Sequence, residues 1–117
     1  MEFNNKYPIY RQLFEIFLSD IINGKLKPGD KFMSIREASI KFNLNPNTVV
    51  NAFKELELQK IAVTKRGLGT FVTEDLEILK NLTANHSQTI LDDFLSKMYS
   101  LGYSNDEIIN QIKERGK

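Results

Sequence analysis

The sequence predicts a mainly α-helical protein that contains one small β-hairpin. Three observations indicate this fold class. Residues 9–56 carry apolar side chains at three- and four-residue steps, which is the spacing of buried helix faces. Residues 61–72 are β-branched at both ends and hold glycines at the centre, which is typical of a hairpin. Beyond residue 72 the composition shifts back to helix-forming residues.

The first helix is expected over residues 9–23, where one face is apolar. That face comprises Tyr10, Leu13, Phe14, Phe17 and Ile21. Pro8 suits the first helical turn, and Gly24 suits the end of the helix. Pro28 and Gly29 then predict a loop, because this pair is a strong turn signal.

Two short helices, joined by about four residues, are expected next. Ser34 and Glu37 fit a capping box, in which each side chain satisfies an exposed amide of the other residue. Ile35, Ala38 and Phe42 are the apolar positions of the first short helix. Asn45 is a suitable N-cap for the second, and Pro46 suits its first position. The second helix is predicted to bury Val49, Ala52, Phe53 and Leu56 and to expose Asn47, Thr48, Val50, Asn51 and Lys54. Such a pair is typical of a helix-turn-helix.

The predicted hairpin follows directly, with its turn at residues 66–69. Three helices followed by a hairpin with a basic, glycine-rich tip predict a winged helix-turn-helix, so residues 1–73 are expected to form a DNA-binding domain. From Lys31 to Thr70, seven basic and three acidic residues give a local net charge of +4, whereas the whole chain carries +1. This basic segment is expected to neutralise phosphates.

Residues 74–117 are expected to form a helical dimerisation region. Its first helix extends from Leu76 to about Leu101 and ends at Gly102, with residues 83–87 as the place for a kink or break. Ser104 and Glu107 form a second capping box ahead of a short final helix. An apolar stripe on the long helix predicts a subunit contact, although the same pattern also fits an intramolecular core. The predicted contact residues are Leu91, Phe94, Leu95 and Met98.

The composition excludes several classes of protein. The chain has no cysteine, which excludes a disulfide scaffold and a thiolate metal site. It shows neither a secretory signal nor an apolar run of about 20 residues, so we expect a soluble, cytoplasmic protein without a membrane partner. The single histidine, His86, and the lack of a glycine-rich phosphate motif argue against an enzyme, and no metal or cofactor is predicted.

The outward face of the third helix suggests contact with DNA. Asn47 and Asn51 lie one turn apart, and asparagine can bond bidentately to adenine. Thr48 can contact a thymine methyl group or a phosphate. The alternative is that these side chains are solvated surface. Asn45 is expected to serve mainly as a cap.

Six ordered motifs across about residues 8–73 resemble the DNA-binding domain of the GntR family of bacterial transcription regulators. They are PIY at 8–10, INGKLKPGD at 22–30, SIREA at 34–38, NPNTV at 45–49, LE at 56–57 and RGLGTFV at 66–72. The helical C-terminal part, with LGYS at 101–104 and EI at 107–108, resembles the small YtrA-like subfamily.

This resemblance implies roles for individual residues. Arg36 would contact DNA at the groove edge, and Gly67 and Gly69 would lie at a wing tip whose backbone approaches the minor groove. Lys65 and Arg66 would contact phosphates. The alternatives are a surface arginine paired with neighbouring acids and a plain solvated hairpin. The full predicted DNA-binding set is Ser34, Arg36, Asn45, Asn47, Thr48, Asn51, Lys54, Lys65, Arg66, Gly67 and Gly69.

The chain departs from the family pattern at three places. Phe32 and Met33 replace the Leu-Pro that often precedes the capping serine. Val50 and Asn51 stand where many members carry a basic residue, which favours A·T-rich recognition because arginine is the usual partner of guanine. The glycine common near Lys60 is absent.

The leading hypothesis is a homodimeric regulator, most simply a repressor, that binds an inverted-repeat operator with half-sites about 34 Å apart. The alternative is a winged-helix module that binds protein and not DNA, because a fold does not determine a function. Residues 74–117 are too few for an enclosed ligand pocket within one chain, so a small-molecule effector is expected only between subunits, if one exists.

Overall fold

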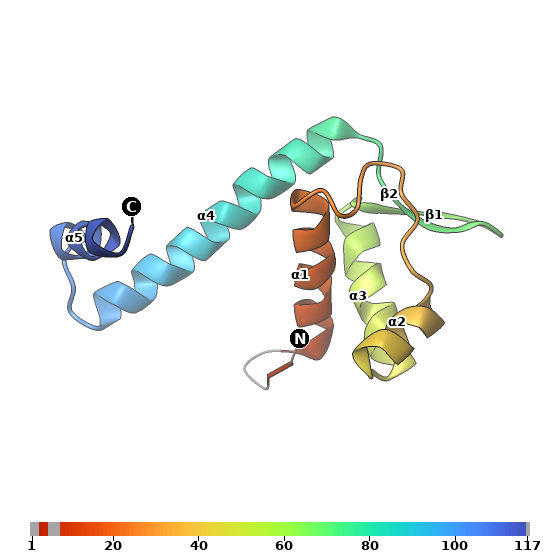
Figure 1. Ribbon diagram of the computed structural model, residues 1–117, viewed down its shortest axis with the longest axis horizontal. Helices are drawn as coiled ribbons and strands as arrows, with labels where there is room; N and C mark the ends of the chain where they lie inside the picture. The colour runs from red at the N-terminus through yellow and green to blue at the C-terminus, as the bar shows by residue number, and fades with distance from the viewer. Residues whose placement is uncertain (1–2, 5–7, 117) are drawn as a thin grey trace. The chain divides into compact units, whose positions relative to one another are not determined.

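The computed structural model describes residues 3–4 and 8–116 and has the predicted fold class (Figure 1). The elements in chain order are α1 (Ile9–Ile22), α2 (Ile35–Phe42), α3 (Pro46–Leu58), β1 (Ala62–Lys65), β2 (Gly69–Val72), α4 (Leu76–Ser100) and α5 (Asn105–Arg115). The chain divides into two compact units, Met1–Lys80 and Asn81–Lys117, which are described separately below. The functional boundary proposed at residue 73 stays a prediction.

The core of the first unit lies where α1 and α2 pack around α3. All four residues predicted for the inward face of α3 are buried: Val49, Ala52, Phe53 and Leu56. Four phenylalanines form the centre, with ring centroids 5.3–6.3 Å apart: Phe17, Phe32, Phe42 and Phe53. Edge-to-face and stacked contacts at such distances stabilise aromatic clusters beyond their buried area.

The predicted apolar faces of α1 and α2 differ in detail from the observed ones. On α1, Leu18 is buried, whereas the predicted Tyr10 and Ile21 are only half-buried. On α2, Ala38 is buried but Ile35 is 41% exposed. Ile35 occupies the first position of a helix of eight residues.

Local hydrogen bonds define the helix-turn-helix. The capping box of α2 is present, since the Ser34 hydroxyl accepts from the Glu37 amide at 3.0 Å and the Glu37 carboxylate accepts from the Ser34 amide at 2.9 Å. Asn43 ends α2 in the left-handed conformation, with φ 53° and ψ 53°, while the Leu44 amide donates to the Ser39 carbonyl. This is a Schellman ending, and asparagine tolerates its left-handed position better than most residues. The Asn45 side chain then caps α3 at the Asn47 amide.

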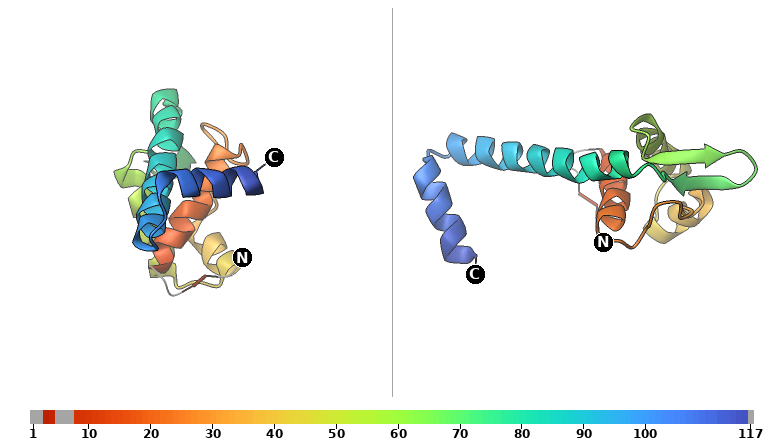
Figure 2. Two further views of the ribbon diagram at one scale, coloured as in Figure 1. Left: turned by 90° about the vertical axis from the view of Figure 1, so that its left-hand side faces the viewer. Right: turned by 90° about the horizontal axis from the view of Figure 1, so that it is seen from above.

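The hairpin forms the wing and projects from the helices of its unit (Figure 2). Its antiparallel register pairs Ala62 with Val72 and Lys65 with Gly69. A β-turn closes the tip, where the Leu68 amide donates to the Lys65 carbonyl and Gly67 has φ 79°. Arg66 and Gly67 are therefore the central residues of the turn. Residue Lys31 adds an isolated antiparallel bridge to Phe71, so that the loop before α2 lies along the outer edge of β2.

Helix α4 runs from Leu76 to Ser100 without interruption, so the break considered at residues 83–87 does not occur. The hydroxyls in this region donate back to helix carbonyls, Ser87 to Ala84 at 3.0 Å and Thr89 to Asn85 at 3.1 Å. A backbone carbonyl has two lone pairs, so it can accept a side-chain hydroxyl as well as its helix amide, and the helix continues through this region. No residue of α4 is buried.

In the second unit, a tight turn joins α4 to α5. Gly102 has φ 92°, and the Tyr103 amide donates to the Met98 carbonyl. Ser104 and Glu107 form the predicted capping box of α5. Ile108 is the buried residue of this helix. Among the described residues, no helix combines the length and apolar character needed to cross a membrane.

Candidate DNA-binding surface

The outward face of α3 presents amide and cationic side chains to solvent. Asn47, Asn51 and Lys54 are exposed and follow one another at steps of four and three residues, which places them on one side of the helix. Thr48 and Val50 beside them are half-buried. Within residues 3–4 and 8–116, the side chains of Asn47, Asn51 and Lys54 make no hydrogen bond or ion pair, so their donors and acceptors are free for another molecule.

Arg36 lies in the first turn of α2 and is exposed. In the described part of the chain its guanidinium makes no ion pair or hydrogen bond. The alternative in which Arg36 pairs with a neighbouring acid has no counterpart among the described residues. The nearest acidic residue in sequence, Glu37, uses its carboxylate in the capping box. The five donors of a guanidinium suit bidentate contact with phosphate or guanine.

The capping box also determines the charge state next to Arg36. The pKa of Glu37 is lowered from 4.5, first by the hydrogen bond from the Ser34 amide, then by the Ser34 hydroxyl, and also by the positive charge of Lys31. The pKa of Glu107 is lowered from 4.5 by the equivalent bonds from Ser104. Both carboxylates are therefore ionised near neutral pH and hold the starts of α2 and α5.

Two predicted site residues act as helix caps. The Ser34 oxygen and the Asn45 Oδ1 atom each accept a backbone amide. The Asn45 side chain keeps a donor, its amide NH₂ group, because the cap uses only the acceptor. The Ser34 hydroxyl also interacts with the Glu37 carboxylate, so it is engaged within the capping box. Capping and a contact with DNA are therefore compatible at Asn45, and the contact expected for Ser34 stays a prediction.

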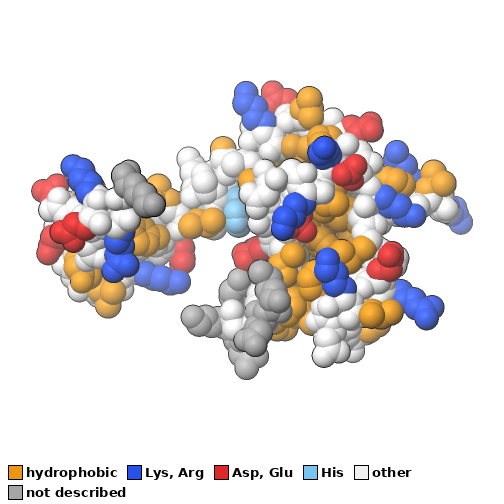
Figure 3. Space-filling view, viewed as in Figure 1, with side chains coloured by type: hydrophobic (Ala, Val, Ile, Leu, Met, Phe, Trp, Pro, Cys, Tyr) orange, Lys and Arg blue, Asp and Glu red, His pale blue; other side chains and the backbone are white. Residues whose placement is uncertain are grey.

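Two basic residues of the wing, Lys65 and Arg66, precede the glycine of its turn, Gly67. Lys65 places its Nζ atom 4.8 Å from the centre of the Phe71 ring, a cation–π contact that orients the ammonium group. Arg66 is exposed at the tip. Figure 3 shows Lys and Arg side chains over the end of the first unit where the hairpin lies, with hydrophobic side chains between them. Gly67 is open, since a Cβ atom built there would meet nothing within 4 Å.

Sequence reasoning counted Lys31 in the basic segment but did not place it beside the wing. Lys31 lies beside the wing because its backbone bridges to Phe71 and the Phe32 amide donates to the Thr70 carbonyl at 2.8 Å. Lys31 takes this position because it pairs with Phe71, 40 residues further along the chain. A local sequence pattern cannot predict such a pairing.

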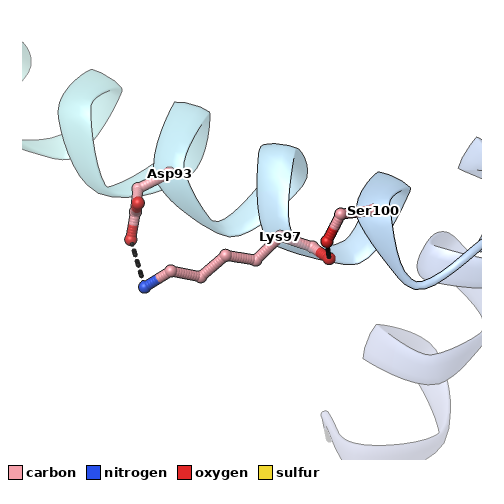
Figure 4. Close-up of polar contacts among 3 residues, drawn as sticks. All are labelled: Asp93, Lys97 and Ser100. Carbon is pink, nitrogen blue, oxygen red and sulfur yellow. Dashed lines mark hydrogen bonds and ion pairs between the residues drawn. The ribbon is translucent and has the colours of Figure 1, made fainter.

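The predicted subunit-contact residues lie on one side of α4, in the second unit. Leu91 and Phe94 are 52% and 36% exposed, and Leu95 and Met98 are half-buried. The opposite side of the helix is polar: Lys97 pairs with Asp93 at 2.9 Å, and the Ser100 hydroxyl donates to the Lys97 carbonyl (Figure 4). An open apolar depression is lined by Ser87, Ile90, Leu91 and Phe94.

Several curated relatives match this chain, and two of them are described here. A transcriptional regulator named YhcF from Bacillus subtilis is 35% identical over 112 residues, which cover 96% of this chain and 93% of the relative. The transcriptional repressor YtrA from the same organism is 44% identical over 68 residues, covering 58% of this chain and 52% of the relative.

Solved structures match as well. A GntR family transcriptional regulator from Listeria monocytogenes is 34% identical with a TM-score of 0.88, covering 96% of this chain and 98% of that one. The DNA-binding domain of AraR, solved in complex with operator ORX1, is 28% identical with a TM-score of 0.58 and covers 62% of this chain and 93% of that one.

A protein-family model also matches this chain, and it names the same family as the Listeria structure. The family described as bacterial regulatory proteins, gntR family, matches residues 9–72, which contain α1, the helix-turn-helix and the wing. The relatives are transcriptional regulators and not enzymes, and they do not favour the protein-interaction module. This chain therefore belongs to the GntR family and is a DNA-binding transcription regulator.

Proposed function

We propose that this regulator acts as a homodimeric repressor, which binds an inverted-repeat operator through α3 and the wing. The observation that carries the proposal is the outward face of α3. Asn47 and Asn51 expose side-chain amides that make no bond within the described chain, one turn apart, at the front of the second helix of a helix-turn-helix. Such a helix enters the major groove with its N-terminal residues toward the base edges.

The residues of this face favour A·T pairs. An asparagine amide matches the donor and acceptor of adenine in the major groove, and the methyl group of Thr48 suits the thymine methyl. Val50 adds a second aliphatic surface. No arginine or lysine stands between Asn45 and Phe53, so this stretch lacks the usual partner of guanine. Lys54 would contact the backbone at the rim of the groove.

Arg36 and the wing would position the protein on the duplex. Arg36, Lys65 and Arg66 supply three cations on two elements that flank α3. The turn at Gly67 has no side chain at its exposed corner, which allows the backbone to approach sugars and phosphates closely. Asn45 would add a hydrogen bond through its free NH₂ group. Ser34 would hold the start of α2, which carries Arg36, through its capping box.

The dimer proposal rests on the exposed apolar side of α4. A 25-residue helix without a buried residue leaves its apolar side uncovered within one chain. The apolar stripe on this helix is formed by Leu91, Phe94, Leu95 and Met98, which recur at steps of three, one and three residues. A second copy would cover it with an equivalent stripe through a two-fold axis, which is the commonest oligomer symmetry. Two-fold symmetry in turn predicts an inverted repeat with half-sites about 34 Å apart.

The repressor assignment rests on a relative. YtrA of Bacillus subtilis, 44% identical over 68 residues, is named a transcriptional repressor. An effector, if one acts here, would have to bind where two copies meet, because the depression on α4 is open in a single chain.

A DNA titration tests the α3 and Arg36 assignments. Fluorescence anisotropy with a duplex from the gene's upstream region should give an affinity that falls steeply with salt and is weaker for a scrambled duplex. Asn47→Ala and Arg36→Ala should each cost about 1–3 kcal/mol, roughly a 5- to 150-fold loss. The matched controls Asn110→Ala and Arg115→Ala, exposed positions on α5, should bind like the wild type. Equal affinities for all five proteins would contradict the assignment.

Sedimentation tests the subunit contact. The wild type should sediment as a dimer at micromolar concentration, and Phe94→Asp should sediment as a monomer because it buries a charge in an apolar contact. Ser96→Asp introduces the same charge on the polar side of α4 and should stay dimeric. A monomeric wild type, or a dimeric Phe94→Asp variant, would show that this face is not the contact.

A further inference from the structure

The side chain of Lys31 fills the space beside Gly69 in which a Cβ atom would lie. A Cβ atom built on Gly69 would lie 2.6 Å from Cε and 3.4 Å from Nζ of Lys31. Gly67, two residues earlier, has nothing within 4 Å of the equivalent position. The lysine side chain therefore lies across Gly69 and uses the space that any other residue would fill.

The backbone of Lys31 is held by the sheet. Lys31 bridges to Phe71, and its two neighbours bond to β2: the Phe32 amide donates to the Thr70 carbonyl and the Val72 amide to the Asp30 carbonyl, both at 2.8 Å. Paired residues of antiparallel strands point to the same face of a sheet, so Lys31 shares a face with Phe71 and with Lys65, whose ammonium lies over the Phe71 ring.

The ammonium group of Lys31 lies between the wing and the start of α2. It is near enough to Glu37 for its charge to contribute to the lowered pKa of that carboxyl. It forms no ion pair in the described part of the chain, and the Glu37 carboxylate is engaged by the Ser34 amide. Lys31 thus lies on the wing, on the same face as Lys65, without an ion pair, while its charge reaches the carboxylate at the start of α2.

We infer that Lys31 is a phosphate-binding residue of the DNA interface, and that Gly69 is needed to seat its side chain. The inference rests on the proposed DNA-binding face and adds to it a contact that joins the wing to α2. Two physical reasons would then favour glycine over other residues at position 69. Its φ of 123° is disfavoured for residues with a Cβ atom, and its missing side chain leaves the path of Lys31 open.

The test compares salt dependence in the full-length chain. For duplex DNA the slope of log affinity against log salt changes by about 0.9 for each phosphate contact. Lys31→Gln should therefore lower the magnitude of the slope by about 0.9, and the affinity at about 0.1 M salt about eightfold, on operator and scrambled DNA alike. Lys25→Gln removes the same charge from an exposed loop position and should leave the slope unchanged.

The role of Gly69 is tested with a matched glycine. Gly69→Ala and Gly24→Ala both place a Cβ atom on a backbone of positive φ, 123° and 80°, but only the first meets Lys31. Because the lysine end is flexible, Gly69→Ala should displace it and lower the slope as Lys31→Gln does, and the double variant should lose no more. Gly24 lies outside the predicted DNA-binding set, so Gly24→Ala should keep the wild-type slope.

The outcomes separate this inference from the proposed function. If the wild type itself binds without salt dependence or sequence preference, the proposed function fails. If the wild type binds as expected but Lys31→Gln has the slope of Lys25→Gln, only the role of Lys31 is overturned. If Lys31→Gln lowers the slope while Gly69→Ala does not, Lys31 contacts DNA without needing Gly69 as its seat, and that half of the inference is overturned.

Discussion

Lys60 is held in a conformation that suits glycine, and its replacement by glycine should stabilise the protein. It follows α3 with φ 63°, while its amide donates to the Glu57 carbonyl and the Ile61 amide donates to the Leu56 carbonyl. These two bonds form a Schellman ending, in which the left-handed residue is usually glycine. The sequence lacks the glycine that the family commonly has near this position, and the chain nevertheless keeps the turn.

The magnitude follows from two opposing contributions. The left-handed conformation costs a residue with a Cβ atom about 1–2 kcal/mol. Glycine removes that cost but increases the conformational freedom of the unfolded chain, which costs about 0.4–1 kcal/mol. The Lys60 side chain is exposed and makes no hydrogen bond or ion pair among the described residues, so its removal loses nothing further. Lys60→Gly should therefore raise the free energy of unfolding by about 0.5–1 kcal/mol.

Thermal and urea unfolding followed by circular dichroism measure this effect. The expected rise in Tm is about 2–5 °C for a chain of this size. Lys54→Gly is the matched control, since it makes the same replacement inside α3 and should cost about 1 kcal/mol. If Lys60→Gly lowers Tm as the control does, Lys60 does not carry the strain assigned to it.

Two further predictions concern stability. Glu37 has a lowered folded pKa, so its contribution is present above its ordinary pKa of 4.5 and is lost as the pH falls through the folded value. The wild type should thus be more stable than Glu37→Gln near pH 7, and urea titrations should find the difference shrinking as the pH falls below 4.5. A difference that grows in acid would contradict the capping role. Leu56 is 0% exposed, so Leu56→Ala should lower the free energy of unfolding by about 2–5 kcal/mol. Leu58 is 78% exposed, so Leu58→Ala should lower it by less than about 0.5 kcal/mol. Similar losses in urea unfolding would mean that α3 does not pack as described.

Much of the fold could be predicted because its signals are local. The capping boxes at Ser34 and Ser104 each act within four residues, so their sequence pattern and their hydrogen bonds coincide. The inward face of α3 was predictable for a similar reason, since the helix period alone decides which side chains share a side. The break considered at residues 83–87 does not occur, since α4 is continuous from Leu76 to Ser100.

The candidate site was predictable only where it lies on such local elements. Arg36, Asn47 and Asn51 could be named from the helix pattern and the family resemblance, and the structure leaves their side chains exposed. Their contacts with DNA stay predictions, as does the role of the apolar side of α4.

The sequence by itself determined where the helices begin, which faces are apolar and where the wing turns, because these follow from interactions over a few residues. Only the tertiary structure decided that Lys31 crosses Gly69 and that Ile35 stays exposed. The physical reason is that each of these depends on packing between segments distant in the chain, which no local period or cap encodes. Lys31 meets Gly69 because the strands pair, and not because of the residues on either side of it.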